Sequence, residues 1–424
     1  MGMTGAGSGV GHDADRGTFS VLGWPAVCFD LFHRVELPRR LEGGLGERIA
    51  WDVAGRAPIA LCMPDGAAYS YVEDRGEVRI VPGVSPDAEL VVELESGAWQ
   101  DYLYELRTSH GLRESRAVRF VRGEFADWDV WEPAIRCMYS GTPIYHPAAL
   151  DLRDLADRPI DLHREFTIRD EPDEMAHFLR ATGYLVVRQV FDADRVEELA
   201  GEVDRIRGLC RDGDRGSLWN EDPNGMRSPY RLTYLGMRSP RIAALADDPT
   251  VRMLCGLAGQ DVVAVTDRDS GQIAVLKEFG TAPEPLSIPD LPWHKDCGLG
   301  GCPVTCPRVH VGIRLDALSQ DSSQLYALAG SWGTVAHERF TPAEWDALPV
   351  VGITTEPGDV TVHMGCGMHA GPATTGAPRR RTLYVQFDNP RIFDITNEYE
   401  TYEQVIPGYG SGYGSGDLLA LSGR

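Results

Sequence analysis

Three residues in the C-terminal half of the chain have the types and spacing of a metal centre. His294 and Asp296 are separated by one residue, and His369 follows a Gly-Asp strand further along. In an extended chain, residues i and i+2 point the same way, so His294 and Asp296 could hold one metal ion from one side. Two imidazoles and one carboxylate form the facial triad of non-haem Fe(II) oxygenases, which leaves positions open for O₂ and a bidentate co-substrate. His363 is the alternative third ligand.

A run of three arginines, 379–381, opens a strand shortly after His369. Strand alternation would place Arg380 and Thr382 on a polar face and Arg381 on a mostly apolar one. A guanidinium fork is suited to clamp the far carboxylate of a dicarboxylate with two hydrogen bonds. Arg379 and Arg381 stay competitors of Arg380, because a slip of one residue reverses the face.

Further residues are candidates for weaker reasons. Gln272 and Lys277 lie on an earlier strand and could reach the co-substrate, but plain strand roles are equally open. Segment 218–238 reads as irregular and is long enough to be a functional loop. The candidate substrate-contacting residues are aromatic or basic: Trp293, Trp332, Trp219, Tyr230 and Arg231.

Four cysteines lie near these motifs. Cys297, Cys302 and Cys306 directly follow Asp296, and Cys366 precedes His369 by three residues. Four thiols could hold a structural Zn²⁺ ion. The spacing matches that of zinc-binding pairs only in part, so we favour a thiol-lined loop that is open to oxidation.

The ordered motifs resemble the phytanoyl-CoA dioxygenase-like family of Fe(II)/2-oxoglutarate oxygenases. The resemblance rests on "QIAVLKEF…LPWHKD", "SSQLYALAGSW" and "PGDVTVHMGCGMHAG…RRRT", and extends over about 166–387. It implies a jelly-roll core, the iron ligands His294, Asp296 and His369, and binding of the 2-oxoglutarate C5 carboxylate by Arg380 with Thr382. It also implies consumption of O₂ and release of succinate and CO₂.

Two departures from that family qualify the resemblance. Ala329-Gly-Ser-Trp stands where the family usually has Pro-Gly-Ser-His, so Trp332 would shape the pocket differently. Asp296 argues against the halogenating variants, in which a small residue leaves room for chloride. Hydroxylation is the default outcome, while desaturation, epoxidation and ring formation stay open.

The N-terminal part has a different pattern. Alternation over 67–81 around Asp-Arg-Gly predicts a hairpin, 88–94 and 118–123 predict further strands, and a helix begins at Ser96. This order resembles the sterol carrier protein-2-like domain, which implies an apolar tunnel for a lipid-like or carrier-bound molecule. A scaffold or dimerisation module, and hence a homodimer, is the alternative.

The elements predict an α+β, mainly β chain, whose many short strands favour a sandwich or barrel behind a small α+β domain. The family resemblance implies that this core is a double-stranded β-helix (jelly roll). A helix is expected at 193–209, and short strands at 272–277, 310–315, 324–328, 359–363 and 382–387. The predicted divisions are a disordered tail 1–17, the sterol carrier protein-2-like domain 18–146, a linker 147–164, the jelly roll 165–400 and a flexible tail 401–424.

Composition limits the class of protein. The 424 residues are 43% hydrophobic and 25% charged, as in ordinary globular proteins, and the net charge is −22. This acidity disfavours nucleic acid and anionic membranes as partners. No apolar run approaches the ~18 residues that span a bilayer. The absence of a signal-peptide pattern and the odd count of nine cysteines predict a cytoplasmic protein with reduced thiols.

Two functions from different classes follow. The first is a non-haem Fe(II)/2-oxoglutarate-dependent oxygenase that hydroxylates, or otherwise oxidises, a small hydrophobic or carrier-bound secondary metabolite. The second is a non-catalytic lipid- or small-molecule-binding protein with an inert jelly roll. The complete His-Asp-His-Arg set favours the first.

Overall fold

The computed structural model describes residues 18–19, 24–221, 225–259, 261–277, 291–317, 324–337, 346–371 and 380–405. The predicted tail 1–17, residues 406–424 of the other tail and Arg379 lie outside this part of the chain. No helix within the described ranges is long and apolar enough to cross a bilayer.

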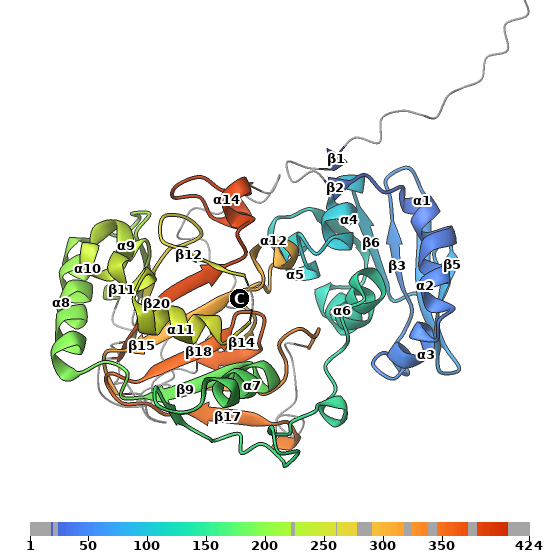
Figure 1. The fold of residues 1–424 in the computed structure, drawn as a ribbon. Helices are drawn as coiled ribbons and strands as arrows, with labels where there is room; N and C mark the ends of the chain where they lie inside the picture. Colours follow the sequence, from blue (N-terminus) through green and yellow to red (C-terminus); the bar gives the residue numbers. More distant parts are fainter. Residues whose placement is uncertain are drawn as a thin grey trace, which may run out of the picture.

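The N-terminal part is built on a five-stranded sheet with the order β5-β4-β3-β6-β7 (Figure 1, blue to cyan). Its strands are β3 (Ile59–Cys62), β4 (Ala68–Asp74), β5 (Glu77–Pro82), β6 (Leu90–Leu94) and β7 (Val118–Arg122). The β4–β5 hairpin turns at Arg75 and Gly76, as predicted. A short pair, β1 (Thr18–Phe19) and β2 (Trp24–Pro25), lies outside this sheet.

Helices complete the N-terminal core. They are α1 (Phe29–Leu31), a π-helical turn (Phe32–Glu36), α2 (Leu37–Leu41), α3 (Leu45–Ala50), α4 (Ser96–Leu103), α5 (Ser109–Glu114) and α6 (Phe125–Ser140). The helix α6 begins in a capping box between Glu124 and Asp127 and buries Trp128 and Trp131 almost completely. Aromatic burial of this kind supplies much of the stability of so small a unit.

The C-terminal part contains two sheets, which together have the architecture expected of a jelly roll. The major sheet has the order β10-β11-β13-β20-β15-β18-β9-β8, and β12 also pairs with β20. Its strands are β8 (Phe166–Thr167), β9 (Tyr184–Arg188), β10 (Ser217–Glu221), β11 (Arg227–Leu232), β12 (Val263–Val265), β13 (Ile273–Lys277), β15 (Val309–Arg314), β18 (Val360–Met364) and β20 (Arg380–Asp388).

The smaller sheet has the order β14-β19-β16-β17. Its strands are β14 (Leu291–His294), β16 (Leu325–Leu328), β17 (Val350–Ile353) and β19 (His369–Gly371). Five predicted strands are thus confirmed, as β13, β15, β16, β18 and β20. The segment 218–238 differs from its prediction: 217–221 and 227–232 pair as a hairpin that joins the edge of the major sheet, because Arg231 and Leu232 find hydrogen-bonding partners on β13.

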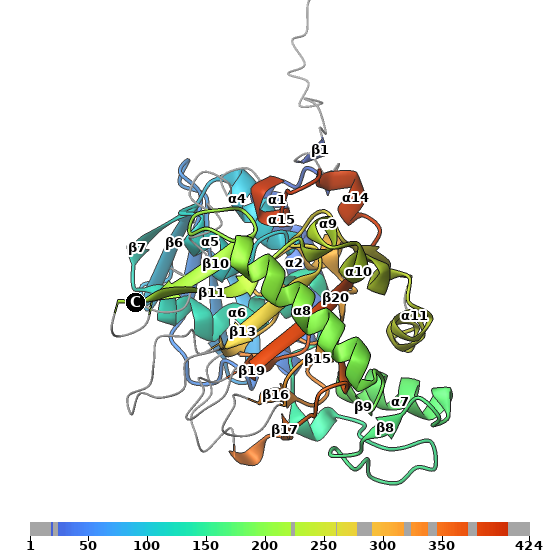
Figure 2. The same ribbon diagram turned by 90° about the vertical axis from the view of Figure 1, so that its left-hand side faces the viewer.

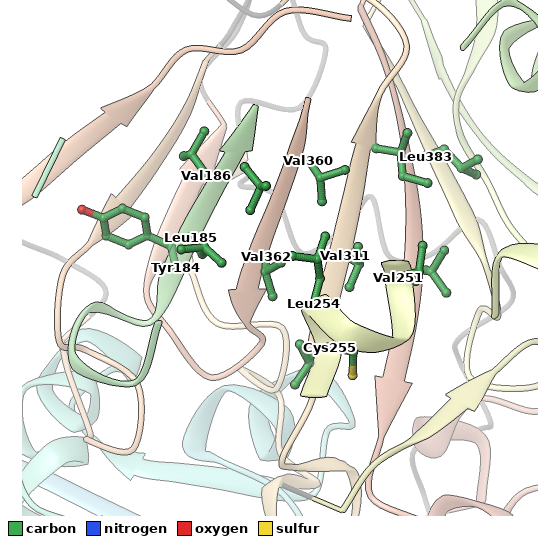
Figure 3. Close-up of a cluster of buried hydrophobic side chains, with 14 of the residues drawn as sticks. Tyr184, Leu185, Val186, Val251, Leu254, Cys255, Val311, Val360, Val362 and Leu383 are labelled. Carbon is green, nitrogen blue, oxygen red and sulfur yellow. The ribbon is translucent and has the colours of Figure 1, made fainter. Parts of the chain in front are cut away.

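Helices cover one face of the major sheet. They include α7 (Pro172–Thr182), α8 (Ala193–Leu209, as predicted), α9 (Leu235–Arg238), α10 (Pro240–Ala243), a 3-10 turn (Ala244–Ala246) and α11 (Pro249–Gly256). Figure 2 shows α8 crossing the strands. Val311, Val362 and Leu383 point from the strands toward Leu254 of α11 (Figure 3). Because side chains alternate along a strand, the other face of the same strands is left for polar groups.

Contacts between the two parts bury a further apolar cluster, made of Leu106, Val265, Val304, Ile392 and Tyr402. It joins the N-terminal part to the short helices α12 (Cys302–Thr305), α14 (Ile392–Ile395) and α15 (Tyr402–Val405). The hydroxyl of Tyr402 donates to the Leu106 carbonyl at 2.9 Å, and its side chain is 2% exposed. The chain therefore stays in the fold beyond 401, the predicted start of the flexible tail, because a buried aromatic contact holds it.

Acidification should destabilise the N-terminal part through His33. Its Nδ1 donates to the Phe29 carbonyl at 2.8 Å, so Nε2 accepts from the Tyr71 hydroxyl at 2.7 Å. Burial lowers the pKa of His33 to about 4, against about 6.5 in an unfolded chain. The unfolded state therefore binds the extra proton between these values, and stability present above pH ~6.5 is lost as the pH falls toward ~4, by on the order of 3 kcal/mol.

Thermal unfolding followed between neutral pH and pH ~5 measures this effect. His33→Gln should weaken the fall of the unfolding midpoint with pH. His163→Gln, at an exposed position, is the matched control and should leave the pH dependence unchanged. Equal pH dependences for wild type and His33→Gln would contradict the assignment.

Candidate active site

The inner face of the major sheet is polar, and strand register shows which side chains share it. Residues directly opposite each other in antiparallel strands project from the same face. His310 of β15 lies opposite His363 of β18 and Gln386 of β20. Arg314 lies opposite Thr382, and Arg380 opposite Lys277. The inner face therefore carries imidazoles toward one end and cations toward the other.

The two predicted imidazole ligands meet across the smaller sheet. His294 of β14 is the register partner of His369 of β19, and their ring centroids are 4.3 Å apart. The Asp296 backbone nitrogen donates to the Gly365 carbonyl at 2.9 Å, which carries this residue toward the major sheet. One potential ligand atom from each of His294, Asp296 and His369 lies within 4.8 Å of the others. The sequence-predicted triad is thus brought together.

The Asp296 carboxylate lies among three imidazoles. Its Oδ1 is 3.8 Å from His369 Nε2, and its Oδ2 is 3.1 Å from His310 Nε2 and 3.8 Å from His363 Nε2. Burial would raise the pKa of Asp296, but His310 and His369 hold that pKa well below its usual range. The side chain keeps 25% of its surface exposed, so the carboxylate is ionised and open on one side.

His310 was not singled out from the sequence, and His363 was only an alternative ligand. Together with Asp296 they form a second group of donors with atoms within 4.8 Å of one another. Burial lowers the pKa of His363 to about 4 and also lowers the pKa of His369, so both rings are neutral at neutral pH. The available signal was the alternation in His310-Val-Gly-Ile-Arg314, whose polar ends share one strand face.

Arg380 and Arg381, at the start of β20, project from opposite faces of the strand, as the alternation of side chains requires. Arg380 is 3% exposed and lies on the inner face near Tyr384 and Arg314. Burial lowers its pKa to about 10. Arg381 points the other way: its Nε and Nη2 donate to the Asp316 carboxylate at 2.9 and 2.8 Å, and Nη1 donates to Asp204 at 2.9 Å. Arg381 is therefore occupied by structural ion pairs.

A second buried cation, Arg314, lies beside Arg380. Its side chain is fully buried and donates to the hydroxyls of Thr382 at 2.8 Å and Thr361 at 2.6 Å. Its Nε has no hydrogen-bond partner, and among the described residues no carboxylate lies within ion-pair distance of it. Gly312 makes room for this arrangement, since a Cβ there would lie 2.7 Å from the Tyr384 ring.

The other predicted cofactor residues take different places. Lys277 is buried on the inner face and donates to the Gly371 carbonyl at 2.6 Å, two residues after His369. Thr382 receives the hydrogen bond from Arg314. Gln272 lies on the opposite, helix-covered side and donates to the Ile242 carbonyl of α10 at 2.8 Å. The structure thus brings Lys277 and Thr382 to the inner face, but not Gln272.

The predicted substrate residues are dispersed. Trp293 packs in an apolar cluster with Tyr145, Leu328 and Met368. Trp332 donates to the Arg180 carbonyl at 2.7 Å, on the outside of α7. Trp219 donates to the Ser217 hydroxyl at 2.8 Å and packs against the helix-side core, and Tyr230 flanks it on β11.

Arg231 differs from the other substrate candidates. Its register partner Val275 lies opposite Thr382, so the arginine projects from the inner face. Its Nε is buried without a hydrogen-bond partner. Of these five residues, Arg231 is therefore the one that alternation directs toward the buried cations.

A separate hollow of about 590 Å³ lies on the N-terminal part. Its lining is mainly apolar and includes Trp24, Leu31, Val35, Tyr104 and Pro303. The volume is in the range of small-ligand pockets. None of the candidate metal or cofactor residues lines it, so the hollow is distinct from the His-Asp cluster.

Residues 179–382 match the family model described as phytanoyl-CoA dioxygenase (PhyH). The family resemblance read from the motifs is confirmed over these residues, while the sterol carrier protein-2-like resemblance of 18–146 stays a prediction. No curated protein shows significant sequence similarity to the chain.

Several solved structures are similar to part of the chain. AviO1 from Streptomyces viridochromogenes Tue57 is 20% identical, with a TM-score of 0.42 over 52% of this chain and 96% of that chain. SnoN, an epimerase solved with Fe³⁺, alpha ketoglutarate and nogalamycin RO, is 19% identical, with a TM-score of 0.41 over 51% and 83%. EctD from S. alaskensis, solved with 2-oxoglutarate and 5-hydroxyectoine, is 17% identical, with a TM-score of 0.44 over 64% and 94%.

Removing Arg381 should cost stability without opening the inner face. Arg381→Ala leaves Asp204 and Asp316 without their shared cation, and we expect a loss of about 2 kcal/mol. Arg34→Ala is the matched control: its pair with Asp30 is exposed, and its loss should cost less than ~1 kcal/mol. Urea unfolding of both variants measures the difference, and similar losses would contradict the structural role of Arg381.

Proposed function

We propose that this protein is a non-haem Fe(II)/2-oxoglutarate-dependent oxygenase that oxidises a small, hydrophobic or carrier-bound molecule. The observation that carries the proposal is the convergence of His294, Asp296 and His369 beside an inner face with two buried arginines. The family match over 179–382 supports the same activity.

The donor chemistry fits Fe(II). Two neutral imidazoles and one carboxylate are the ligand set of non-haem iron oxygenases. His310 and His363 lie against Asp296 Oδ2, and Oδ1 is directed at the His369 side. Partners of this kind fix the orientation of a ligating carboxylate. We therefore assign His294, Asp296 and His369 as ligands, and His310 and His363 as positioning residues.

The buried cations fit a dicarboxylate. Burial disfavours the charged form of Arg380 and lowers its pKa, and the neighbouring Arg314 adds to that cost. An anionic ligand between them would relieve it, as a carboxylate does when it meets a guanidinium fork. Thr382 and Tyr384 lie on the same strand face and could complete the binding of the C5 carboxylate, while Lys277 and Arg231 add positive charge around it.

When bound, iron and 2-oxoglutarate would supply the oxidising chemistry, with O₂ consumed and succinate and CO₂ released. The chain itself supplies position: it holds the ligands at the smaller sheet and the anion on a strand face of the major sheet. The apolar outer layer of the major sheet keeps this frame rigid. Hydroxylation is the default outcome that we propose.

Anaerobic titration with Fe(II) and 2-oxoglutarate tests this assignment. We expect a weak visible charge-transfer band in wild type, its loss in His369→Ala, and at least a tenfold weaker 2-oxoglutarate affinity in Arg380→Met, about 1.4 kcal/mol or more. Arg252→Met, at an exposed position on α11, is the matched control and should behave as wild type. A folded, iron-loaded wild type without the band would overturn the proposal and favour a non-catalytic binding protein.

Substitution of Arg314 should weaken the binding of 2-oxoglutarate and leave the binding of iron unchanged. Arg314→Met should raise the KM for 2-oxoglutarate at least tenfold, because half of the proposed anion site is lost, while Fe(II) affinity measured without 2-oxoglutarate stays unchanged. Arg314→Lys should restore part of the affinity, since it keeps the charge but not the fork. If a folded Arg314→Met protein keeps the wild-type KM for 2-oxoglutarate, the role of Arg314 is limited to its structural hydrogen bonds with Thr361 and Thr382.

A further inference from the structure

Four cysteine side chains meet at the boundary between the two parts of the chain. We call them the thiol cluster: Cys297, Cys302, Cys306 and Cys366. The sulphurs of the first three lie within 4.8 Å of one another. The Cys306 thiol also contacts that of Cys366. We propose that the thiol cluster is a tetrahedral thiolate site for a Zn²⁺ ion, separate from the iron centre.

The geometry suits one small ion. Four sulphurs around zinc, with bonds of about 2.3 Å, lie about 3.8 Å apart in a tetrahedron. The sulphurs of Cys297, Cys302 and Cys306 need to contract by no more than about 1 Å to reach this spacing, while Cys366, which contacts Cys306, would have to approach the other two as well. Cys302 and Cys306 occupy the first residue and the C-cap of α12, one helical turn apart, which directs both sulphurs the same way. An iron–sulphur cluster needs its thiolates further apart than this.

Three cations lie near the thiol cluster. Lys295 and Arg136 act on the Cys297 sulphur, and Arg308 interacts with that of Cys306. Lys295 is 7% exposed, and its Nζ donates to the Ser331 carbonyl at 3.3 Å and also to that of Thr334. The Gly333 backbone N–H lies against the Cys366 sulphur. Such cations and N–H donors are typical of the outer shell of thiolate metal sites.

The thiol cluster also has a clear structural task. The Thr108 hydroxyl donates to the Gly298 carbonyl at 2.6 Å, and its backbone N–H donates to Leu299 at 3.0 Å. Gly300 lies so close to the N-terminal part that a Cβ would be 2.4 Å from the Leu106 carbonyl oxygen, and its φ is +130°. One side of the loop 297–306 thus packs against the N-terminal part. A zinc ion bound by the thiol cluster would hold the other side of the loop in place.

The same ion would support both strands that carry the triad. Cys297 follows Asp296 directly, and Cys366 precedes His369 by three residues. All nine cysteines are free in the structure, so no disulfide performs this task. The sequence spacing matched zinc-binding pairs only in part, but the fold brings Cys366 into contact with Cys306. The inference does not rest on the proposed function.

Metal analysis of the full-length chain tests the inference. The protein is reduced, incubated with Zn²⁺, dialysed against zinc-free buffer and analysed by mass spectrometry for bound zinc. We expect about one zinc per chain in His369→Ala, which removes an iron-site donor only, and at least one in wild type, whose triad can also take up Zn²⁺. Zinc retained in His369→Ala separates this outcome from failure of the proposed iron site.

In the His369→Ala background, Cys302→Ser should lower the zinc content at least tenfold, since it removes one of four ligands. Cys62→Ser is the matched control: Cys62 lies half-buried on β3, where its thiol faces the Val92 carbonyl at 3.5 Å, and its loss should leave zinc in place. Equal zinc contents in the two variants would overturn the site.

Cobalt substitution tests the site in wild-type protein, so the result does not depend on whether a variant folds. Wild type reconstituted with Co²⁺ should show the thiolate-to-metal charge-transfer bands and the intense visible bands of tetrahedral thiolate coordination. A mercurial reagent should release the metal from native protein. Wild type that binds neither Zn²⁺ nor Co²⁺ in this way, or that contains a disulfide within the thiol cluster by mass mapping, overturns the inference.

Discussion

The polar groups inside the jelly roll are arranged around one negative charge, the Asp296 carboxylate. It follows β14 of the smaller sheet, yet its oxygens face His310 and His363 of the major sheet. The interaction therefore links the two sheets electrostatically. Burial would raise the pKa of this carboxylate, but the imidazoles against it hold that pKa below its usual range, while burial lowers the pKa values of His363 and His369. Ionised oxygen beside neutral ring nitrogen is the state that a divalent metal requires.

Strand alternation extends this arrangement over the major sheet. One face buries valine and leucine beneath α8 and α11, and the other carries histidine, arginine and threonine. The apolar face stabilises the sheet strongly enough for the polar face to hold buried charge. Arg314 and Arg380 are such charges, and two enclosed cations near each other are a poor choice for stability but a good one for binding a dianion.

The boundary between the two parts is built from the segments that flank the triad. Loop 297–306 lies against Thr108 and Leu106, and Tyr402 closes the same apolar cluster. Changes at this boundary would thus reach Asp296 and His369 through a few residues of backbone. This continuity gives the N-terminal part a route of influence on the site even though its own hollow lies apart from it.

The sequence by itself predicted five strands of the jelly roll, the long helix 193–209, and three residues, His294, Asp296 and His369, that the structure brings together, because alternation, helical spacing and the His-x-Asp motif are local patterns. It also placed Arg380 and Arg381 on opposite faces. Only the tertiary structure decided that His310 and Arg314 join the site, that 218–238 forms a hairpin, and that Cys366 meets the other three cysteines. These outcomes depend on register between strands distant along the chain, and register is set by packing and pairing rather than by any one segment.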